Sequence, residues 1–216
     1  MKRKLAILGI AGISLMGSLS IQAQKTEKLF NGKDLSNWEF LVDKNSVPAE
    51  QVYSVKDGMI QIAGQPFGYM YTKQKYSNYK LHVEWRWPDG KEANSGIFLL
   101  IEDLKNPFPN GVECQLHAGD AGDFVLLGGS DLAEFQNKPG QPRPAFPVVQ
   151  KHTKSSENKA GEWNEANIFV KDGVITVYIN GVYQNTGTNK VKEGHIGLQS
   201  EGGPIQFRNV TLTPWE

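Results

Sequence analysis

The 216-residue sequence has one cysteine, no formal net charge and little sign of helices. A lone thiol, Cys114, excludes an internal disulfide and zinc sites built from several thiolates, so we expect a small buried hydrophobic residue there. Lys and Arg together number 23, as do Asp and Glu. No global field therefore favours nucleic acid or an anionic membrane, and partners must be recognised locally.

Three familiar catalytic motifs are also missing. The sequence contains no Gly-x-Ser-x-Gly nucleophile elbow, no phosphate-binding Gly-Lys-Ser/Thr and no His-Glu-x-x-His zinc motif. Whatever chemistry the chain carries must therefore come from residues brought together by the fold.

Long apolar runs are confined to the N-terminus. Lys2 to Lys4 form a positive region, Leu5 to Leu19 an apolar core, and Ser20 to Ala23 a small-residue cleavage site. This pattern predicts a secretory signal peptide over residues 1–23 and a periplasmic or extracellular mature chain, residues 24–216, forming a single domain. The apolar run is about 15 residues, short of the roughly 20 needed to span a membrane, so we expect no membrane insertion of the mature chain.

Residues 79–87 form the clearest alternating pattern, Tyr-Lys-Leu-His-Val-Glu-Trp-Arg-Trp. Side chains of a strand alternate between faces, so this segment predicts a β-strand with its apolar face in a core. The other face carries Lys80, His82, Glu84 and Arg86. It is either a solvated outer face or one wall of a ligand-binding groove.

Short strands and turns fill the remaining sequence. The pairs Asp57-Gly58, Asp172-Gly173 and Asn180-Gly181 predict hairpin turns. Further strands are predicted at 69–72, 94–101, 112–117, 124–127, 166–171, 174–179, 195–200 and 205–212. The apolar end of 94–101 indicates a strand buried on both faces, whereas 118–162 is loop-rich. Ten or more short strands predict an all-β, two-sheet antiparallel β-sandwich of jelly-roll type.

Polar residues occupy matching phases of three predicted strands. They are Glu84 and Arg86; Glu113, Gln115 and His117; and His195 and Gln199, with Glu201 just after the last strand. If these strands were neighbours in one sheet, their polar faces would merge into a groove. Carboxylates and amides bond sugar hydroxyls, Trp rings pack on sugar C–H faces, and paired carboxylates supply acid–base catalysis.

A loop after the second of these strands has metal-ligand chemistry. His117, Asp120 and Asp123 are candidate ligands of a divalent metal such as calcium. A calcium site needs six or more oxygen ligands, so a solvated acidic loop is the competing interpretation and no metal residue is assigned.

An ordered set of motifs resembles the 3-keto-disaccharide hydrolase domain family. These motifs are Leu29-Phe-Asn-Gly-Lys-Asp-Leu-Ser-Asn-Trp38, Glu84-Trp-Arg86, Asn94-Ser-Gly-Ile97, Val112-Glu-Cys-Gln115, Gly161-Glu-Trp-Asn164, Ile179-Asn-Gly181, Gly194-His-Ile-Gly-Leu-Gln199 and Phe207-Arg-Asn-Val210. The resemblance implies a concanavalin A-like jelly roll and an exported carbohydrate-active protein. Its members are thought to cleave glycosides that have first been oxidised to a ketone at C3.

The resemblance also implies roles for individual residues. Glu113, in the Val-Glu-Cys-Gln motif, becomes the candidate base, and Arg86 a candidate enolate stabiliser. His117 and Glu201 become candidate acids. The predicted groove is completed by Glu84, Asn94, Gln115, Gln199, Trp163 and His195, although packing against the core or an edge is the favoured alternative for Trp163. The stretch after Gln115 departs from the commoner family pattern, which leaves the acid and the substrate preference open.

Three functions remain open at this stage. The first is an exported hydrolase or lyase acting on 3-keto-glycosides; the others are a non-catalytic carbohydrate-binding module and a glycan-recognising adhesin. Converging carboxylates with an Arg favour the enzyme, because a lectin does not need them. This hypothesis predicts that Glu84, Glu113 and Gln199 line one cleft.

Overall fold

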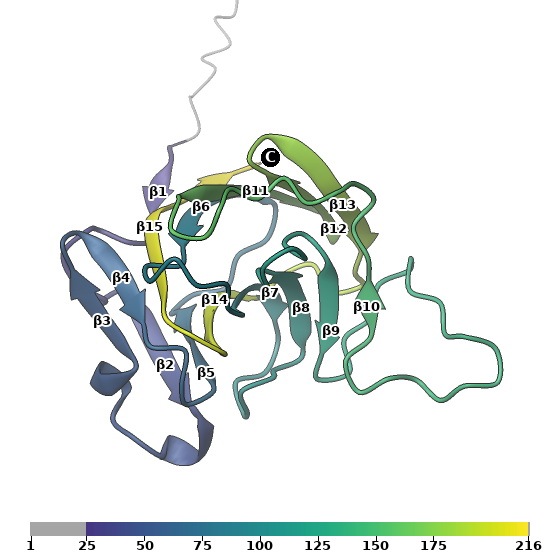
Figure 1. Cartoon of the computed structure of the whole chain (residues 1–216). Helices are drawn as coiled ribbons and strands as arrows, with labels where there is room; N and C mark the ends of the chain where they lie inside the picture. Colours follow the sequence, from purple (N-terminus) through teal and green to yellow (C-terminus); the bar gives the residue numbers. More distant parts are fainter. Residues whose placement is uncertain (1–24, 216) are drawn as a thin grey trace, which may run out of the picture.

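The computed structural model describes residues 25–215, which form two antiparallel β-sheets packed face to face (Figure 1). The predicted all-β sandwich is confirmed. Within the described range the only helical turns are two short 3₁₀ segments, η1 (Asp43–Asn45) and η2 (Ala49–Gln51). None of the described helices is long and apolar enough to cross a membrane. The predicted signal peptide, residues 1–23, lies outside the described residues.

Sheet A is the eight-stranded sheet that arches across the top of Figure 1. Its spatial order is β13 (Val182–Thr188), β12 (Val174–Ile179), β11 (Asn164–Lys171), β6 (Tyr79–Arg86), β15 (Ile205–Pro214), β4 (Met59–Ile62) and β3 (Tyr53–Lys56), with β1 (Glu27–Lys28) paired to β15. The alternating strand at 79–87 is therefore β6, near the centre of this sheet.

Sheet B has seven strands and lies below sheet A in Figure 1. Its spatial order is β10 (Val148–Val149), β9 (Phe124–Leu127), β8 (Gly111–Gln115), β7 (Gly96–Ile101), β14 (His195–Ser200), β5 (Gly68–Thr72) and β2 (Trp38–Val42). β7 and β8 are shorter than the strands predicted at 94–101 and 112–117, because residues 94–95 and 116–117 lie outside them.

All three predicted hairpin turns are confirmed. They join β3 to β4, β11 to β12, and β12 to β13. In each turn both central residues have positive φ, for example 50° at Asn180 and 76° at Gly181. Asn, Asp and Gly tolerate this left-handed conformation, and its twist matches that of the flanking strands.

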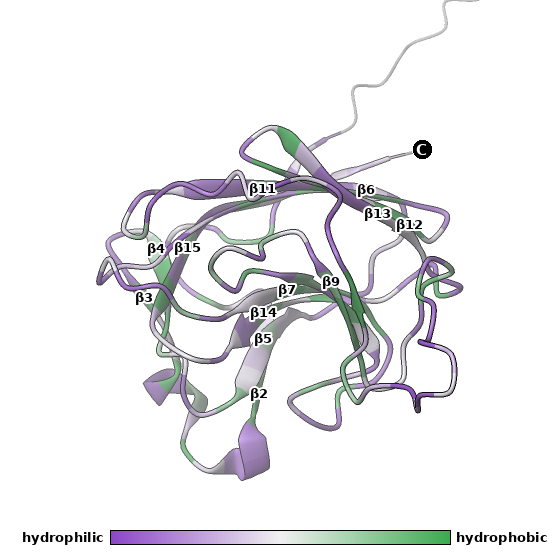
Figure 2. Cartoon of the chain, turned by 45° about the vertical axis from the view of Figure 1, so that its right-hand side comes forward, coloured by the Kyte–Doolittle hydropathy of each residue, from purple (hydrophilic) through white to green (hydrophobic). Residues whose placement is uncertain are grey.

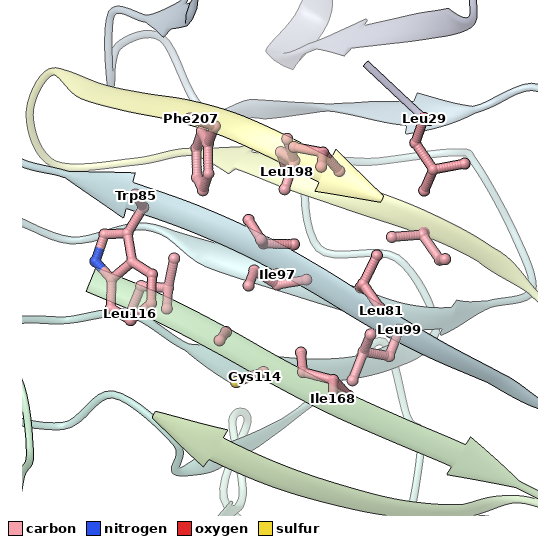
Figure 3. Packing of buried hydrophobic residues seen from close by; sticks show 14 of the residues in the cluster. Leu29, Leu81, Trp85, Ile97, Leu99, Cys114, Leu116, Ile168, Leu198 and Phe207 are labelled. Atoms are coloured by element: carbon pink, nitrogen blue, oxygen red, sulfur yellow. The ribbon is translucent and has the colours of Figure 1, made fainter. Parts of the chain in front are cut away.

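The main core lies between the two sheets (Figure 3). Leu81 and Trp85 of β6 point into it from sheet A, and Ile97 and Cys114 point into it from sheet B. Cys114 is fully buried, as predicted. Replacing a side chain as large as Trp85 by alanine in such a core lowers the free energy of unfolding by about 3–5 kcal/mol. Burial on this scale stabilises a fold whose single cysteine forms no disulfide.

A second apolar cluster covers part of the outer face of sheet B. Phe98 and Ile101 of β7 belong to it, and Leu104 and Phe108 from the following loop pack against it. β7 is consequently buried on both faces, as its apolar sequence predicted. In Figure 2, β7 and β9 carry much hydrophobic colour, whereas β11 in sheet A, with one solvated face, shows more hydrophilic colour.

The loop-rich segment 118–162 is tied to the edges of both sheets. β9 and β10 pair within it. The buried Asn185 of β13 donates through Nδ2 to the carbonyls of Gly122, at 3.2 Å, and Val149, at 2.9 Å. The strand pairing and these hydrogen bonds hold parts of the segment against the sandwich.

Candidate active site

The polar residues predicted to form one groove lie on two separate faces. Trp85 of β6 and Cys114 of β8 both point into the core between the sheets. Their neighbours Glu84 and Glu113 therefore point outward, one from sheet A and one from sheet B. The prediction that Glu84, Glu113 and Gln199 line one cleft is wrong. Alternation fixed the phase of each strand correctly but carried no information on which sheet the strand would join.

On sheet B, the Glu113 carboxyl lies over Gly96 of the neighbouring strand. A Cβ atom at Gly96 would stand 2.2 Å from Glu113 Oε1, so only glycine leaves the space that this carboxyl fills. Glu113 is 3% exposed. A glycine inside a strand marks such a close approach, and this was the available sequence signal for Gly96, to which no role was assigned.

Gln199 and Glu201 complete the cluster from β14. Leu198 pairs with Ile97, so Gln199, one residue further, comes alongside Gly96. Gln199 Nε2 donates a 2.6 Å hydrogen bond to Glu201 Oε2, and the Asn94 side chain also hydrogen-bonds Glu201. Strands β8 and β14, the loop after β14 and the loop before β7 thus bring a pair of carboxyl groups and a pair of amides together.

Three buried oxygens in this cluster have no hydrogen-bond partner among the described residues. They are Asn94 Oδ1, Glu113 Oε1 and Gln199 Oε1. Leaving a buried polar atom unpaired costs about 1–3 kcal/mol, so three together are unusual unless a ligand pairs with them. Amide oxygens accept hydrogen bonds, and sugar hydroxyls donate them.

The two carboxyl groups have different environments. Burial, and then the nearby charge of Glu201, raise the pKa of Glu113 well above its usual value. Burial also raises the pKa of Glu201, but the donors from Gln199 and Asn94 oppose the shift. Donors stabilise the ionised form, and Glu113 has none at its free oxygen. The pair therefore favours a protonated Glu113 beside an ionised Glu201.

A cavity of about 420 Å³ adjoins the cluster. It is lined by Asp89, Lys91, Glu92, Ala93, Asn94, His117, Gly202, Gly203 and Pro204. Asn94 belongs to both the cavity and the cluster, and Gly202 follows Glu201. This cavity is where a ligand could reach the carboxyl pair.

His117 and Gln115 stand at the rim of this site. His117 is exposed, lines the cavity, and has Nδ1 2.9 Å from Asp120 Oδ2. Gln115 Oε1 accepts hydrogen bonds from the backbone N–H groups of Leu116, at 2.9 Å, and His117, at 2.8 Å. The side-chain oxygen of Gln115 is thus already paired with the backbone of the turn, whereas its side-chain nitrogen, Nε2, can donate to a ligand.

The candidate metal ligands do not fit a divalent cation in this arrangement. The Lys151 ammonium lies 3.5 Å from Asp120 Oδ1 and 3.5 Å from Asp123 Oδ1. The Lys151 backbone N–H also donates to Asp123 Oδ1 at 2.8 Å. Over residues 25–215, no group of three or more His, Cys, Asp and Glu side chains is placed to hold a metal ion.

On sheet A, Glu84 is engaged by its neighbours on β15. Its carboxylate accepts 2.6 Å hydrogen bonds from Arg208 Nε and Asn209 Nδ2. Burial opposes the charge, but the hydrogen bonds from Asn209 and Arg208 outweigh it and hold the pKa of Glu84 below its usual value. Arg86 Nε donates to Gln206 Oε1 at 2.7 Å. Glu84 and Arg86 therefore link β6 to β15, and neither faces Glu113.

The two remaining predicted residues also lie away from the cluster. Trp163 belongs to the sheet A face, where the guanidinium carbons of Arg86 and Arg208 lie 4.7 and 3.9 Å from its ring centroid. His195 is at the other end of β14, with Nδ1 2.8 Å from the Thr72 carbonyl. Four residues of strand place His195 roughly 13 Å from Gln199.

The two packed antiparallel sheets place the chain among the jelly-roll sandwiches. The solved structure of a glycosyl hydrolase candidate from Parabacteroides distasonis superposes with a TM-score of 0.63 at 21% identity. The match covers 88% of this chain and 94% of the other. A carbohydrate-binding module from Bacillus subtilis gives a TM-score of 0.58 at 12% identity, covering 82% and 95%. These similarities show the fold.

The chain belongs to the 3-keto-alpha-glucoside-1,2-lyase-like domain family, whose model matches residues 25–213. A curated relative, the 3-keto-disaccharide hydrolase of Bacteroides thetaiotaomicron, is 23% identical over 241 residues, covering 90% of this chain and 80% of that protein. The family resemblance found in the sequence motifs is therefore confirmed, and the chain is a member of a carbohydrate-active, glycosyl hydrolase-like family.

Proposed function

We propose that this protein is an exported enzyme that cleaves 3-keto-glycosides by β-elimination followed by addition of water. The family and its curated relative support this substrate class. The N-terminal sequence pattern supports export. The observation that carries the proposal is the buried pair of unlike carboxyl groups, Glu113 and Glu201, beside unpaired amide oxygens.

A ketone at C3 makes this chemistry accessible to two carboxyl groups. The ketone acidifies the proton on C2, and a base removes that proton to give an enolate. The electron pair then forms the C1–C2 double bond as the C1–O bond breaks, and an acid protonates the departing oxygen. Water adds across the resulting enone to give the free 3-keto-sugar. The site needs one base, one acid and donors for the enolate.

The environments of the two carboxyl groups suggest their roles. Glu201 is ionised and held by Gln199 and Asn94, so we assign it as the base that takes the C2 proton. Glu113 retains its proton in the buried site, so we assign it as the acid that protonates the leaving oxygen. This exchanges the roles expected from the motif alone, because burial without hydrogen-bond donors favours the neutral form of Glu113.

Stabilisation of the enolate is assigned to the rim of the site. The sequence pointed to Arg86, but its guanidinium is on sheet A, across the core. His117 lines the cavity and is close enough for its charge to influence Glu201. We therefore assign His117 as the hydrogen-bond donor to the enolate.

Cleavage of 3-keto-trehalose or 3-keto-lactose, beside the unoxidised sugars, tests this function. We expect wild type to cleave only the oxidised sugars. Glu113→Gln and Glu201→Gln should each lower kcat/KM by at least about 100-fold, since each removes one proton-transfer group. Glu84→Gln is the matched control and should retain wild-type activity.

Exchange of the C2 proton with deuterated solvent separates the two roles. Glu113→Gln should still exchange C2–H while failing to expel the leaving sugar, and Glu201→Gln should lose both. The reverse pattern would overturn the assignment of acid and base. Sugar binding by wild type without cleavage of either form would overturn the enzyme and leave the binding module, the alternative that the Bacillus subtilis likeness supports.

A further inference from the structure

The outer face of sheet A carries a row of aromatic side chains outside the core. A cavity of about 550 Å³ there is lined by Asn167, Phe169, Lys171, Val174, Thr176, Tyr178, Gly181 and Trp215. We call this the aromatic pocket. It lies at the end of sheet A away from Glu84, because Glu165 is opposite Glu84 whereas Phe169 is opposite Lys80. The whole core separates it from Glu113.

Aromatic rings cross three strands at this pocket. The ring centroids of Trp215 and Phe169 are 6.0 Å apart, those of Phe169 and Tyr178 5.7 Å, and those of Tyr178 and Tyr183 5.8 Å. All four side chains are only half-buried. Successive rings meet edge to face, at 76°, 81° and 68°, which fixes their orientations and leaves ring area open to solvent.

Hydrogen-bonding groups and cations stand beside these rings. Thr176 and Tyr178 place hydroxyl groups in the pocket lining, and Asn167 adds an amide. The Lys80 and Lys171 ammonium groups each lie 5.4 Å from the Trp215 ring centroid. The lining includes no carboxylate. Aromatic area next to hydroxyls, an amide and ammonium groups is the mixture that a sugar ring requires, with its apolar C–H face and polar edge.

We propose that the aromatic pocket is a second carbohydrate-binding site, which holds a pyranose unit of a glycan chain against Tyr178 and Trp215. Its volume lies within the range of about 300–1,000 Å³ typical of small-ligand pockets. The lining combines ring area with a hydroxyl group on Tyr178 and nearby positive charge, and these polar features suit a glycan better than a purely apolar partner. The proposal goes beyond the cleavage reaction, since the pocket and the Glu113 cluster are on opposite sheets.

Electrophoresis through gels containing a dissolved polysaccharide tests this site. One arm uses neutral polymers, such as a β-glucan, and the other uses anionic polymers, such as an alginate, which the two lysines would favour. We expect wild type to be retarded in at least one arm. Tyr178→Ala and Trp215→Ala should weaken this retardation by about tenfold or more, corresponding to the roughly 1.4 kcal/mol carried by a ring contact.

Two further variants make the result specific. Tyr178→Phe keeps the ring and should retain most of the retardation, while Phe146→Ala removes an exposed ring elsewhere and should change nothing. Glu113→Gln should abolish cleavage and leave retardation intact, so failure of one site is distinguishable from failure of the other. Wild type that migrates freely in every gel overturns the proposal. So does retardation that survives both alanine variants, or sedimentation showing a dimer that Tyr178→Ala dissociates.

Discussion

Glu113 has the least exposed carboxyl group among the described residues. A carboxyl group at 3% exposure must be paired, or it gives up its charge. Its free oxygen has no partner among the described residues, and the one nearby charge that acts on it is that of Glu201. Glu113 therefore folds in its neutral form, and the protein is less stable wherever that form is lost.

The buried Glu113 carboxyl should consequently make its own contribution to how the stability of the protein depends on pH. The unfolded pKa is close to the ordinary 4.5, and the folded pKa is raised well above it. The stabilising contribution is fully present below pH 4.5 and is lost as pH rises through the folded pKa. Glu113→Gln stays neutral at every pH. Between pH 4.5 and the folded pKa of Glu113, it should therefore gain stability relative to wild type by about 1.4 kcal/mol per pH unit.

Urea unfolding between pH 4 and pH 9 measures this difference. Glu102→Gln, at an exposed position, is the matched control and should follow the wild-type curve. Stability curves of Glu113→Gln and wild type that run parallel from acid to alkaline pH would show that the carboxyl is not held neutral.

Among elements, the hairpins are the part of the fold most firmly encoded by local sequence. Asp57-Gly58, Asp172-Gly173 and Asn180-Gly181 all adopt the left-handed conformation that their residue types favour. Two of their glycines differ in surroundings. Gly181 has nothing within 4 Å of its missing Cβ, whereas a Cβ at Gly173 would stand 2.3 Å from the Asn189 carbonyl oxygen.

Alanine at these two glycines should separate backbone strain from steric clash. Gly181→Ala, at φ 76°, should lose about 1–2 kcal/mol of unfolding free energy, the cost of a left-handed L-residue. Gly173→Ala should lose this plus the overlap with Asn189, a total larger by about 1–3 kcal/mol. Thermal or urea unfolding of both variants checks the order, and equal losses would contradict it.

The strands illustrate what the sequence could predict and what it could not. Alternation placed Leu81 and Trp85 in the core correctly, because side-chain phase is a property of one strand. Sheet membership is a property of distant pairs, such as Glu84 with Arg208, and no local pattern encodes it. The carboxyl cluster was therefore foreseen only in part: Glu113, Gln199 and Glu201 come together, while Glu84 and Arg86 belong to the other sheet.

For the molecule as a whole, the apolar core between the sheets separates the outer face of sheet A from that of sheet B. Glu84 and Glu113, of similar chemistry and the same strand phase, face opposite directions. The Glu84 carboxylate is already satisfied by Arg208 and Asn209. Its environment fits a role in holding β6 to β15.

Substitutions on the two faces should therefore act on different properties. Glu84→Gln should lose about 1 kcal/mol of stability, because a half-exposed ion pair is weakened, and should leave kcat/KM for a 3-keto-disaccharide within about twofold. Glu113→Gln should instead gain stability above pH 4.5 and lose kcat/KM. The double variant should show the sum of the effects of the two single substitutions. Coupling between them above about 0.5 kcal/mol would contradict the separation of the faces.

The order of strands also determines when the chain can fold. β6 bonds to β15 across 124 residues, and β14 inserts between β7 and β5, which come far earlier in the chain. Neither sheet is complete until its C-terminal strand is available, and pairings of such high contact order form slowly. The chain should thus remain open through most of its synthesis. Such a delay suits a protein that has to be threaded through a narrow channel before it folds, as the proposed export requires.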